Sequence, residues 1–185
     1  AIDSIRLKMD EPIIDLHSDS HFMGEALRQA IKAYEAAETP IGAVIVREGK
    51  IIARAFNQVE TLTDATAHAE MLAITQAESE VGNWRLNDCT LYVTKEPCPM
   101  CAGAIVHARL ARVVFGTNDP KAGAAGGALN LLQFPTLNHQ CEITPGLRED
   151  ECTRLLKSFF REQREMAKAR RNSLVEGSES EIDES

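Results

Sequence analysis

One junction limits the possible folds more than any other part of the sequence. Residues 89–94, CTLYVT, have the composition of a β-strand, and an apolar, Ala-rich helical pattern follows them closely. Cys98 and Cys101 stand where the strand gives way to the helix. Because the first turn of a helix brings residues i and i+3 to the same side, both sulfur atoms can reach a single metal ion. A CxxC pair alone is also typical of redox sites and structural zinc sites.

Hydrophobic periodicity predicts further helices and strands on both sides of this junction. We expect helices at about 21–37, from near Ala67 to about Ser79, and from about Arg148 to Arg171, and strands at 41–46, 51–56, 112–117 and, shorter, 141–144. The first two of these strands flank the turn REGK and predict a β-hairpin. The alternation of strands and helices predicts an α/β fold in which helices cover both faces of one sheet.

The length of 185 residues suits one domain with two terminal extensions. We expect an N-terminal extension at 1–20, the folded domain at 21–171 and a disordered acidic tail at 172–185. Neither extension has a periodic apolar face, so both are expected to be dispensable for folding. The sequence has no run of eighteen apolar residues that would predict a membrane span, and its first residues do not follow the pattern of a signal peptide.

Charge and cysteine content point to a reducing compartment and leave the partner open. The net charge is −8, and the last ten residues carry five acids and no base. Residues 161–171 hold five bases and two acids. The overall charge argues weakly against a nucleic-acid partner, but such a local basic patch could bind one, or could simply be a solvated helix face. Five cysteines without the spacing of a disulfide scaffold favour the cytoplasm.

The segment TAHAEM, thirty residues before the cysteine pair, supplies the rest of a metal site. His68 and Glu70 open the second expected helix, as Cys98 and Cys101 open the third. Two thiolates and one imidazole are a typical ligand set for zinc. A structural zinc usually has four protein ligands, whereas a catalytic zinc keeps one position for water. With three ligands evident, we expect Glu70 to shuttle protons beside the open position without binding the metal.

HAE and PCPMC together form the H-x-E…P-C-x-x-C pattern, by which the chain resembles the zinc nucleobase deaminases. PIGAVIV, LYVTKEPCPMCAGAIVHAR and RVVFGTNDPKAGAAG look like segments of the bacterial tRNA-specific adenosine deaminases, and the resemblance covers about residues 20–165. It implies a cytidine-deaminase-like three-layer sandwich with one mixed sheet, a homodimer and one Zn²⁺ per subunit. The implied reaction converts adenosine to inosine at the wobble position of a tRNA anticodon, with the anticodon stem-loop as partner.

The same resemblance implies roles for individual residues. The four residues of the H-x-E and C-x-x-C patterns match the zinc ligands and the proton shuttle. Asn57 matches a residue that contacts the flipped-out nucleotide, and Asp119 matches one near its sugar and phosphate. The other expected substrate contacts are Ala69, through its backbone N–H at a helix start, His139, Arg161 and Arg164.

Two other functions remain open on the sequence alone. The metal-site pattern fits equally well a deaminase of a free nucleobase or nucleoside, such as cytosine, guanine or cytidine. The basic last helix and the loop NDPKAG favour RNA over these small substrates. The second alternative is a zinc-stabilised RNA-binding module without activity. Glu70 argues against it, because a structural zinc site does not need a carboxylate beside an open position.

Overall fold

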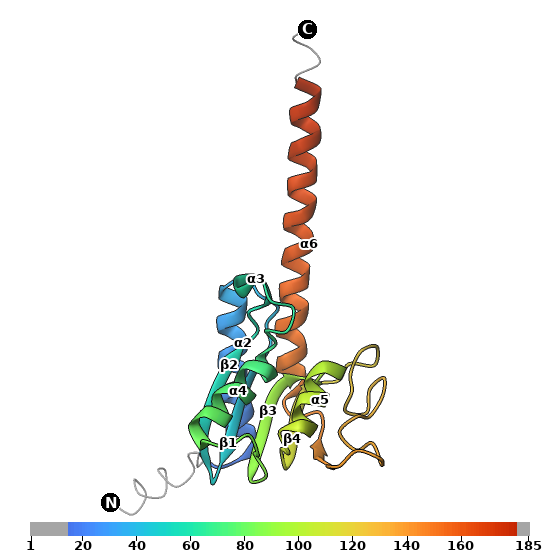
Figure 1. Ribbon diagram of the computed structural model, residues 1–185. Coiled ribbons are helices and arrows are strands. Elements are labelled where there is room, and N and C mark those ends of the chain that lie inside the picture. Colours follow the sequence, from blue (N-terminus) through green and yellow to red (C-terminus); the bar gives the residue numbers. More distant parts are fainter. Residues whose placement is uncertain (1–14, 181–185) are drawn as a thin grey trace, which may run out of the picture.

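The computed structural model describes residues 15–180, with side chains described as far as Leu174 (Figure 1). Its strands form one five-stranded sheet in the order β2-β1-β3-β4-β5. The helices are α2 (Asp19–Glu35), α3 (Val59–Leu62), α4 (Ala69–Val81), α5 (Pro99–His107) and α6 (Glu149–Ser180). The strands are β1 (Gly42–Arg47), β2 (Lys50–Phe56), β3 (Cys89–Lys95), β4 (Arg112–Thr117) and β5 (Glu142–Thr144).

The sheet is mixed, as the resemblance implied. β1 runs antiparallel to both β2 and β3, whereas β3, β4 and β5 are parallel to one another. The expected hairpin is confirmed: Glu48 and Gly49 alone join β1 to β2, with φ values of 50° and 73°. Two positive φ values are what a two-residue type I′ turn requires, and glycine adopts such a value without steric strain.

Side chains of the strands alternate between two separate hydrophobic cores. Ala43 and Ile45 face the core formed with α4 and α5, whereas Val44 and Val46 face the core formed with α2 and α6. This period of two is the geometry of a strand that is buried on both faces. The result is the predicted three-layer sandwich, with two helices on each side of the sheet (Figure 1).

The first helix begins earlier than its periodicity predicted. Ser18 caps α2 by accepting a hydrogen bond from the backbone N–H of His21 at 3.1 Å, so the helix starts at Asp19. The Asp19 carboxylate accepts two hydrogen bonds from Arg112, at 2.9 and 2.7 Å, and one from the Tyr92 hydroxyl at 2.7 Å. The last residues of the expected N-terminal extension therefore belong to the domain, while residues 1–14 lie outside the described part.

The last helix is longer than expected. The sequence predicted a disordered tail after Arg171, but α6 continues to Ser180. Its buried face ends at Phe159, and the next residue, Phe160, is 46% exposed. All of residues 161–174 are exposed, and this part of α6 extends away from the domain (Figure 1). Once a helix is nucleated, each further residue adds a backbone hydrogen bond, so the helix continues without an apolar face.

The short helix α3 was not expected, because its four residues are too few for a periodic pattern. Within the described residues, no helix combines the length and the apolar character needed to cross a membrane.

Candidate active site

Two helices of the same layer begin side by side at the candidate metal site. His68 is the N-cap residue of α4, and Cys98 is the N-cap residue of α5. Pro99 occupies the first turn of α5, where its missing N–H has no intrahelical partner to lose. Because α4 and α5 contact each other on one face of the sheet, ligands thirty residues apart in sequence become neighbours.

The three predicted ligands form one cluster. Nδ1 of His68 lies 3.6 Å from Sγ of Cys98 and 3.5 Å from Sγ of Cys101, and all three donor atoms lie within 4.8 Å of one another. A tetrahedral zinc with Zn–S bonds of about 2.3 Å and Zn–N bonds of about 2.0–2.1 Å places such N and S atoms about 3.6 Å apart. The arrangement of the donors therefore fits zinc. Three protein ligands also leave one tetrahedral position for a ligand from solution.

The pKa values of the two thiols shift in opposite directions because the two groups interact. Hydrogen bonds from Cys101 and His68 lower the pKa of Cys98 to about 3. The pKa of Cys101 is raised by its hydrogen bond to Cys98 and by burial, so the Cys101 sulfur keeps its proton. A divalent cation supplies the positive charge that allows both to become thiolates.

Glu70 lies in the first turn of α4, beside the cluster and not among its ligands. Its side chain is 4% exposed, and burial raises the pKa of this carboxyl group. With His68, Ala69 and Asn57 it lines a cavity of about 200 Å³. Ala69 is the first residue of α4, so its N–H is one of those left without a carbonyl partner at a helix start. The structure thus brings four of the predicted residues to one cavity.

Asn57 is oriented by a residue that the sequence did not reveal. Its Nδ2 donates to Oε2 of Glu38 at 3.4 Å. Glu38 also accepts the backbone N–H groups of Glu60 at 3.2 Å and Thr61 at 2.6 Å, and it lines the same cavity. These partners lie 19 to 23 residues further along the chain, so no local pattern identifies the role of Glu38.

Asp119 lies on the loop after β4, where it forms an ion pair with Lys95 at the end of β3. A second unpredicted carboxylate, Glu96, holds this loop. It is 2% exposed and accepts the backbone N–H groups of Asp119 at 2.7 Å, Ala125 at 3.0 Å and Gly127 at 2.7 Å. Glu96 therefore ties the loop to the segment that leads into the cysteine ligands.

The remaining predicted contacts lie outside the cavity. The Nε2 atom of His139 lies 2.6 Å from the carbonyl oxygen of Leu110, beyond the C-terminal end of α5. The cysteine ligands are at the other end of this nine-residue helix, about 14 Å away at 1.5 Å per residue, so His139 is not brought to the cluster within one chain. Arg161 and Arg164 line an open groove of about 600 Å³ that reaches Thr117 at the end of β4.

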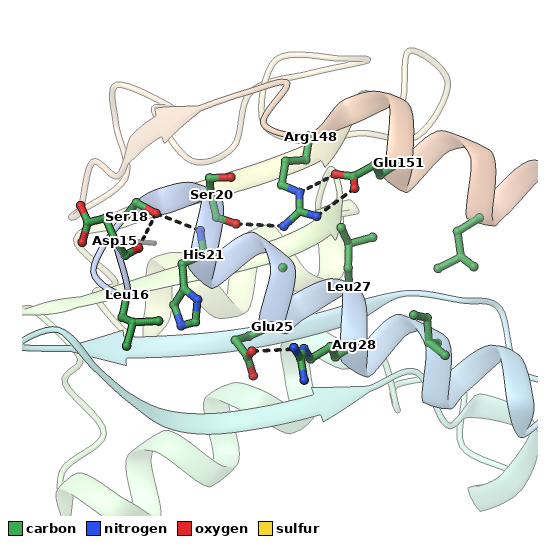
Figure 2. A pocket seen from close by; sticks show the side chains of 13 residues that line it. Asp15, Leu16, Ser18, Ser20, His21, Glu25, Leu27, Arg28, Arg148 and Glu151 are labelled. Carbon is green, nitrogen blue, oxygen red and sulfur yellow. Dashed lines mark hydrogen bonds and ion pairs between the residues drawn. The ribbon is translucent and has the colours of Figure 1, made fainter. Parts of the chain in front are cut away.

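Another cavity, of about 780 Å³, lies between the starts of α2 and α6 and contains none of the predicted site residues. Figure 2 shows the Arg148 side chain there, between Glu151 and the backbone carbonyl of Ser20. The guanidinium group is thus already paired with a carboxylate and a carbonyl. The candidate active site is the cavity beside the metal cluster.

The sequence agrees with a known family over most of its length. The model of the MafB19-like deaminase family matches residues 17–164. A tRNA-specific adenosine deaminase of Bacillus subtilis is 53% identical over 158 residues, which are 85% of this chain and 98% of that protein. A protein of the same name from Agrobacterium fabrum is 46% identical over 145 residues, covering 78% of this chain and 95% of its own length.

Solved structures agree with this assignment. One, from a study of A-to-I editing by tRNA:A34 deaminases at the wobble position of transfer RNA, has a TM-score of 0.72 and 44% identity, covering 74% of this chain and 99% of its own. A guanine deaminase from Bacillus subtilis has a TM-score of 0.54 and 42% identity, but covers only 60% of this chain and 71% of its own. From the metal cluster, the buried Glu70 and relatives that match over nearly their whole length, we conclude that this chain belongs to the tRNA-specific adenosine deaminase family.

Proposed function

We propose that this protein deaminates adenosine to inosine at the wobble position of a tRNA anticodon. The observation that carries the proposal is a cluster of three zinc-type donors, one of which, His68, lines a cavity together with a buried carboxyl group. The identity of the substrate, an adenine base within a tRNA, is inferred from the family to which the chain belongs.

The residues of the donor cluster and of the cavity beside it divide the chemistry among them. His68, Cys98 and Cys101 would hold a zinc ion, which when bound activates water as a nucleophile at neutral pH. Glu70 accepts one proton of that water and passes it to the ring nitrogen N1, where it stays. It then takes the remaining proton of the added hydroxyl group and passes it to the departing amine. The backbone N–H of Ala69, at the first position of α4, is proposed to donate a hydrogen bond to the substrate.

The recessed position of the cavity favours a base from a single-stranded loop. A base must leave its stack to reach Glu70, which is 4% exposed. The bases of an anticodon loop are already unpaired. The free energy needed to unstack one of them is therefore lower than that of extruding a paired base, which is roughly a few kcal/mol. Asp119, on the loop after β4, is proposed to lie near the sugar and phosphate of that nucleotide.

The basic part of α6 is proposed to bind the anticodon stem. Lys157, Arg161 and Arg164 line the groove that begins at Thr117. Thr117 lies at the end of β4, immediately before the loop that carries Asp119, so the groove starts near the proposed nucleotide contacts. Basic side chains along such a path suit phosphate contacts, which position RNA without reading its sequence.

A homodimer in the cytoplasm is the proposed working state. Leu129, Phe134 and Leu137 lie on the segment between β4 and β5, and they are 41%, 47% and 39% exposed in the single chain. A second copy of the chain is proposed to cover this surface. All five cysteines are free, which fits a reducing compartment.

The test compares substrates for the zinc-loaded protein. An anticodon stem-loop with adenosine at the wobble position should yield inosine, whereas the same RNA with its only adenosine in a stem pair should not. Free adenine, guanine, cytosine and cytidine serve as competing substrates, guanine in particular because of the guanine deaminase of Bacillus subtilis. Faster turnover of free guanine than of the stem-loop would refute the proposal.

A further inference from the structure

The side-chain amide of Asn57 is held in one orientation. Its Nδ2 faces Oε2 of Glu38 at 3.4 Å. A carboxylate can only accept hydrogen bonds, so the reversed amide would place two acceptor oxygens against each other. The repulsion between them fixes the orientation even though the hydrogen bond is long. Nδ2 therefore points to Glu38, and Oδ1 points away from it.

Glu38 cannot turn away to release this amide. Its two oxygens accept the backbone N–H groups of Glu60 and Thr61, in the first turn of α3. The residue is 1% exposed. Both carboxylate oxygens are thus fixed by the backbone before any substrate arrives. Such an arrangement needs no reorganisation when the substrate binds.

Oδ1 of Asn57 is available to a ligand. Glu38 is the one hydrogen-bond partner of the Asn57 side chain within residues 15–180. Since no fully buried side-chain oxygen or nitrogen in that part of the chain lacks a partner, Oδ1 must be accessible. Asn57 and Glu70 line the same cavity, and we infer that this oxygen is accessible from it.

We propose that Glu38 is a positioning residue that makes Asn57 present a hydrogen-bond acceptor, and not a donor, to the substrate. The site then selects a nucleoside that offers an N–H or O–H donor there. Adenosine has two sources of such a donor, the exocyclic amino group of its base and the hydroxyl groups of its ribose. The inference rests on the proposed function, because it takes adenosine in RNA as the substrate.

A reciprocal exchange of the two side chains tests the proposal. In Glu38→Gln the new amide can donate, so Asn57 is free to reverse, and kcat/KM for the stem-loop should fall roughly 10- to 100-fold. The activity of Asn57→Asp should fall at least as far, because this change places two carboxylates face to face. In the double variant the new amide at position 38 donates to the new carboxylate at position 57, whose other oxygen again offers an acceptor. Its activity should exceed that of the poorer single variant by about 10-fold or more.

Several measurements keep the outcomes distinct. Zinc content and melting temperature of each variant separate an effect on the substrate from loss of metal or fold. If the fold-changes in kcat/KM of the two single variants simply multiply in the double variant, Glu38 acts only by supporting α3 and the inference is wrong. If the wild-type protein does not turn over the stem-loop, the proposed function fails instead.

The source of the donor is tested with 2′-deoxyadenosine at the target position. A ribose donor predicts that the wild type discriminates against the deoxy substrate more strongly than Glu38→Gln does. A base donor predicts that the ratio of kcat/KM between the ribose and the deoxyribose substrate is the same for the wild type and for Glu38→Gln. A structure of the wild type bound to the stem-loop needs no variant. Oδ1 of Asn57 should lie within hydrogen-bond distance of a substrate donor, and its NH₂ group donating to the substrate would overturn the proposal.

Discussion

The proposed metal ligands take their positions from the backbone of two helix starts. His68 and Cys98 are each the residue immediately before a helix, and Cys101 follows within the first turn of α5. The free N–H groups and the dipole of a helix start favour negative charge, which suits a thiolate. Glu70 lies in the same first turn of α4 and is not a member of the cluster, which suits its proposed role as a proton carrier.

This division of roles predicts opposite behaviour for two variants. Glu70→Gln removes a proton carrier and no ligand, so it should keep its zinc while turnover falls by about 10²–10⁴. Cys101→Ala removes a ligand and should lose most of the zinc together with the activity. Metal analysis and single-turnover rates on the same preparations measure both. Zinc content that falls in step with the rate of Glu70→Gln would make Glu70 a ligand, and full zinc in Cys101→Ala would exclude this cluster.

At this scale, the sequence predicted residues that act through local spacing and missed those that act over long distances. The ligands and Glu70 are visible because H-x-E and C-x-x-C each lie within one turn of a helix. Glu38 and Glu96 accept N–H groups up to 23 and 31 residues away, on loops whose paths depend on the complete fold. A buried carboxylate of this kind has no pattern of its own in the sequence.

The elements of the domain follow from the sequence wherever burial repeats with a regular period. Strand β4 has the predicted bounds, and β1, β2 and α4 begin and end within a few residues of theirs. The predicted and observed elements differ where no buried side chains determine the bounds of a helix. Helix α3 has four residues and none is buried, and the end of α6 continues by backbone hydrogen bonding alone.

The exposed part of α6 allows a test of the RNA contact with a matched control. Arg164 lines the groove beside Thr117, whereas Arg170 lies outside it, about a third of a turn around the same helix. Arg164→Ala should weaken binding of the stem-loop. It should also reduce the slope of log K against log[salt] by about one unit, because the loss of one phosphate contact means that fewer counterions are released on binding. Arg170→Ala should change the slope less. Equal slopes in Arg164→Ala and the wild type, measured by titration from low to moderate salt, would remove this arginine from the interface.

At the scale of the whole molecule, an ion pair joins the start of α2 to the start of β4. Asp19 at the start of α2 and Arg112 at the start of β4 are 93 residues apart in sequence and form two hydrogen bonds. The hydrogen bond from Arg112 is the main reason why the pKa of Asp19 lies below its ordinary value of 3.8. Because the folded state favours the charged form, this contribution to stability is complete above that value and is lost as pH falls through the lower pKa of the folded protein.

Asp19→Asn should therefore lower stability near neutral pH, by up to about 1 kcal/mol because the pair is partly exposed. The difference in melting temperature between variant and wild type should shrink as pH falls below 3.8. Glu142→Gln is the control, since Glu142 also faces Arg112, at 3.6 Å, but is 72% exposed. A difference that stays constant down to low pH would show that Asp19 stabilises the fold through packing alone.

The exposed arm of α6, residues 161–174, has a consequence for the evolution of this protein. Residues 161–174 are all exposed, so substitutions there leave both hydrophobic cores intact. The family match ends at residue 164, and the Bacillus subtilis relative aligns over 98% of its own length but 85% of this chain. Selection can therefore alter the length and charge of the arm while the catalytic cavity stays as it is. Under the proposed role of α6, affinity for RNA can therefore change independently of the rate of turnover.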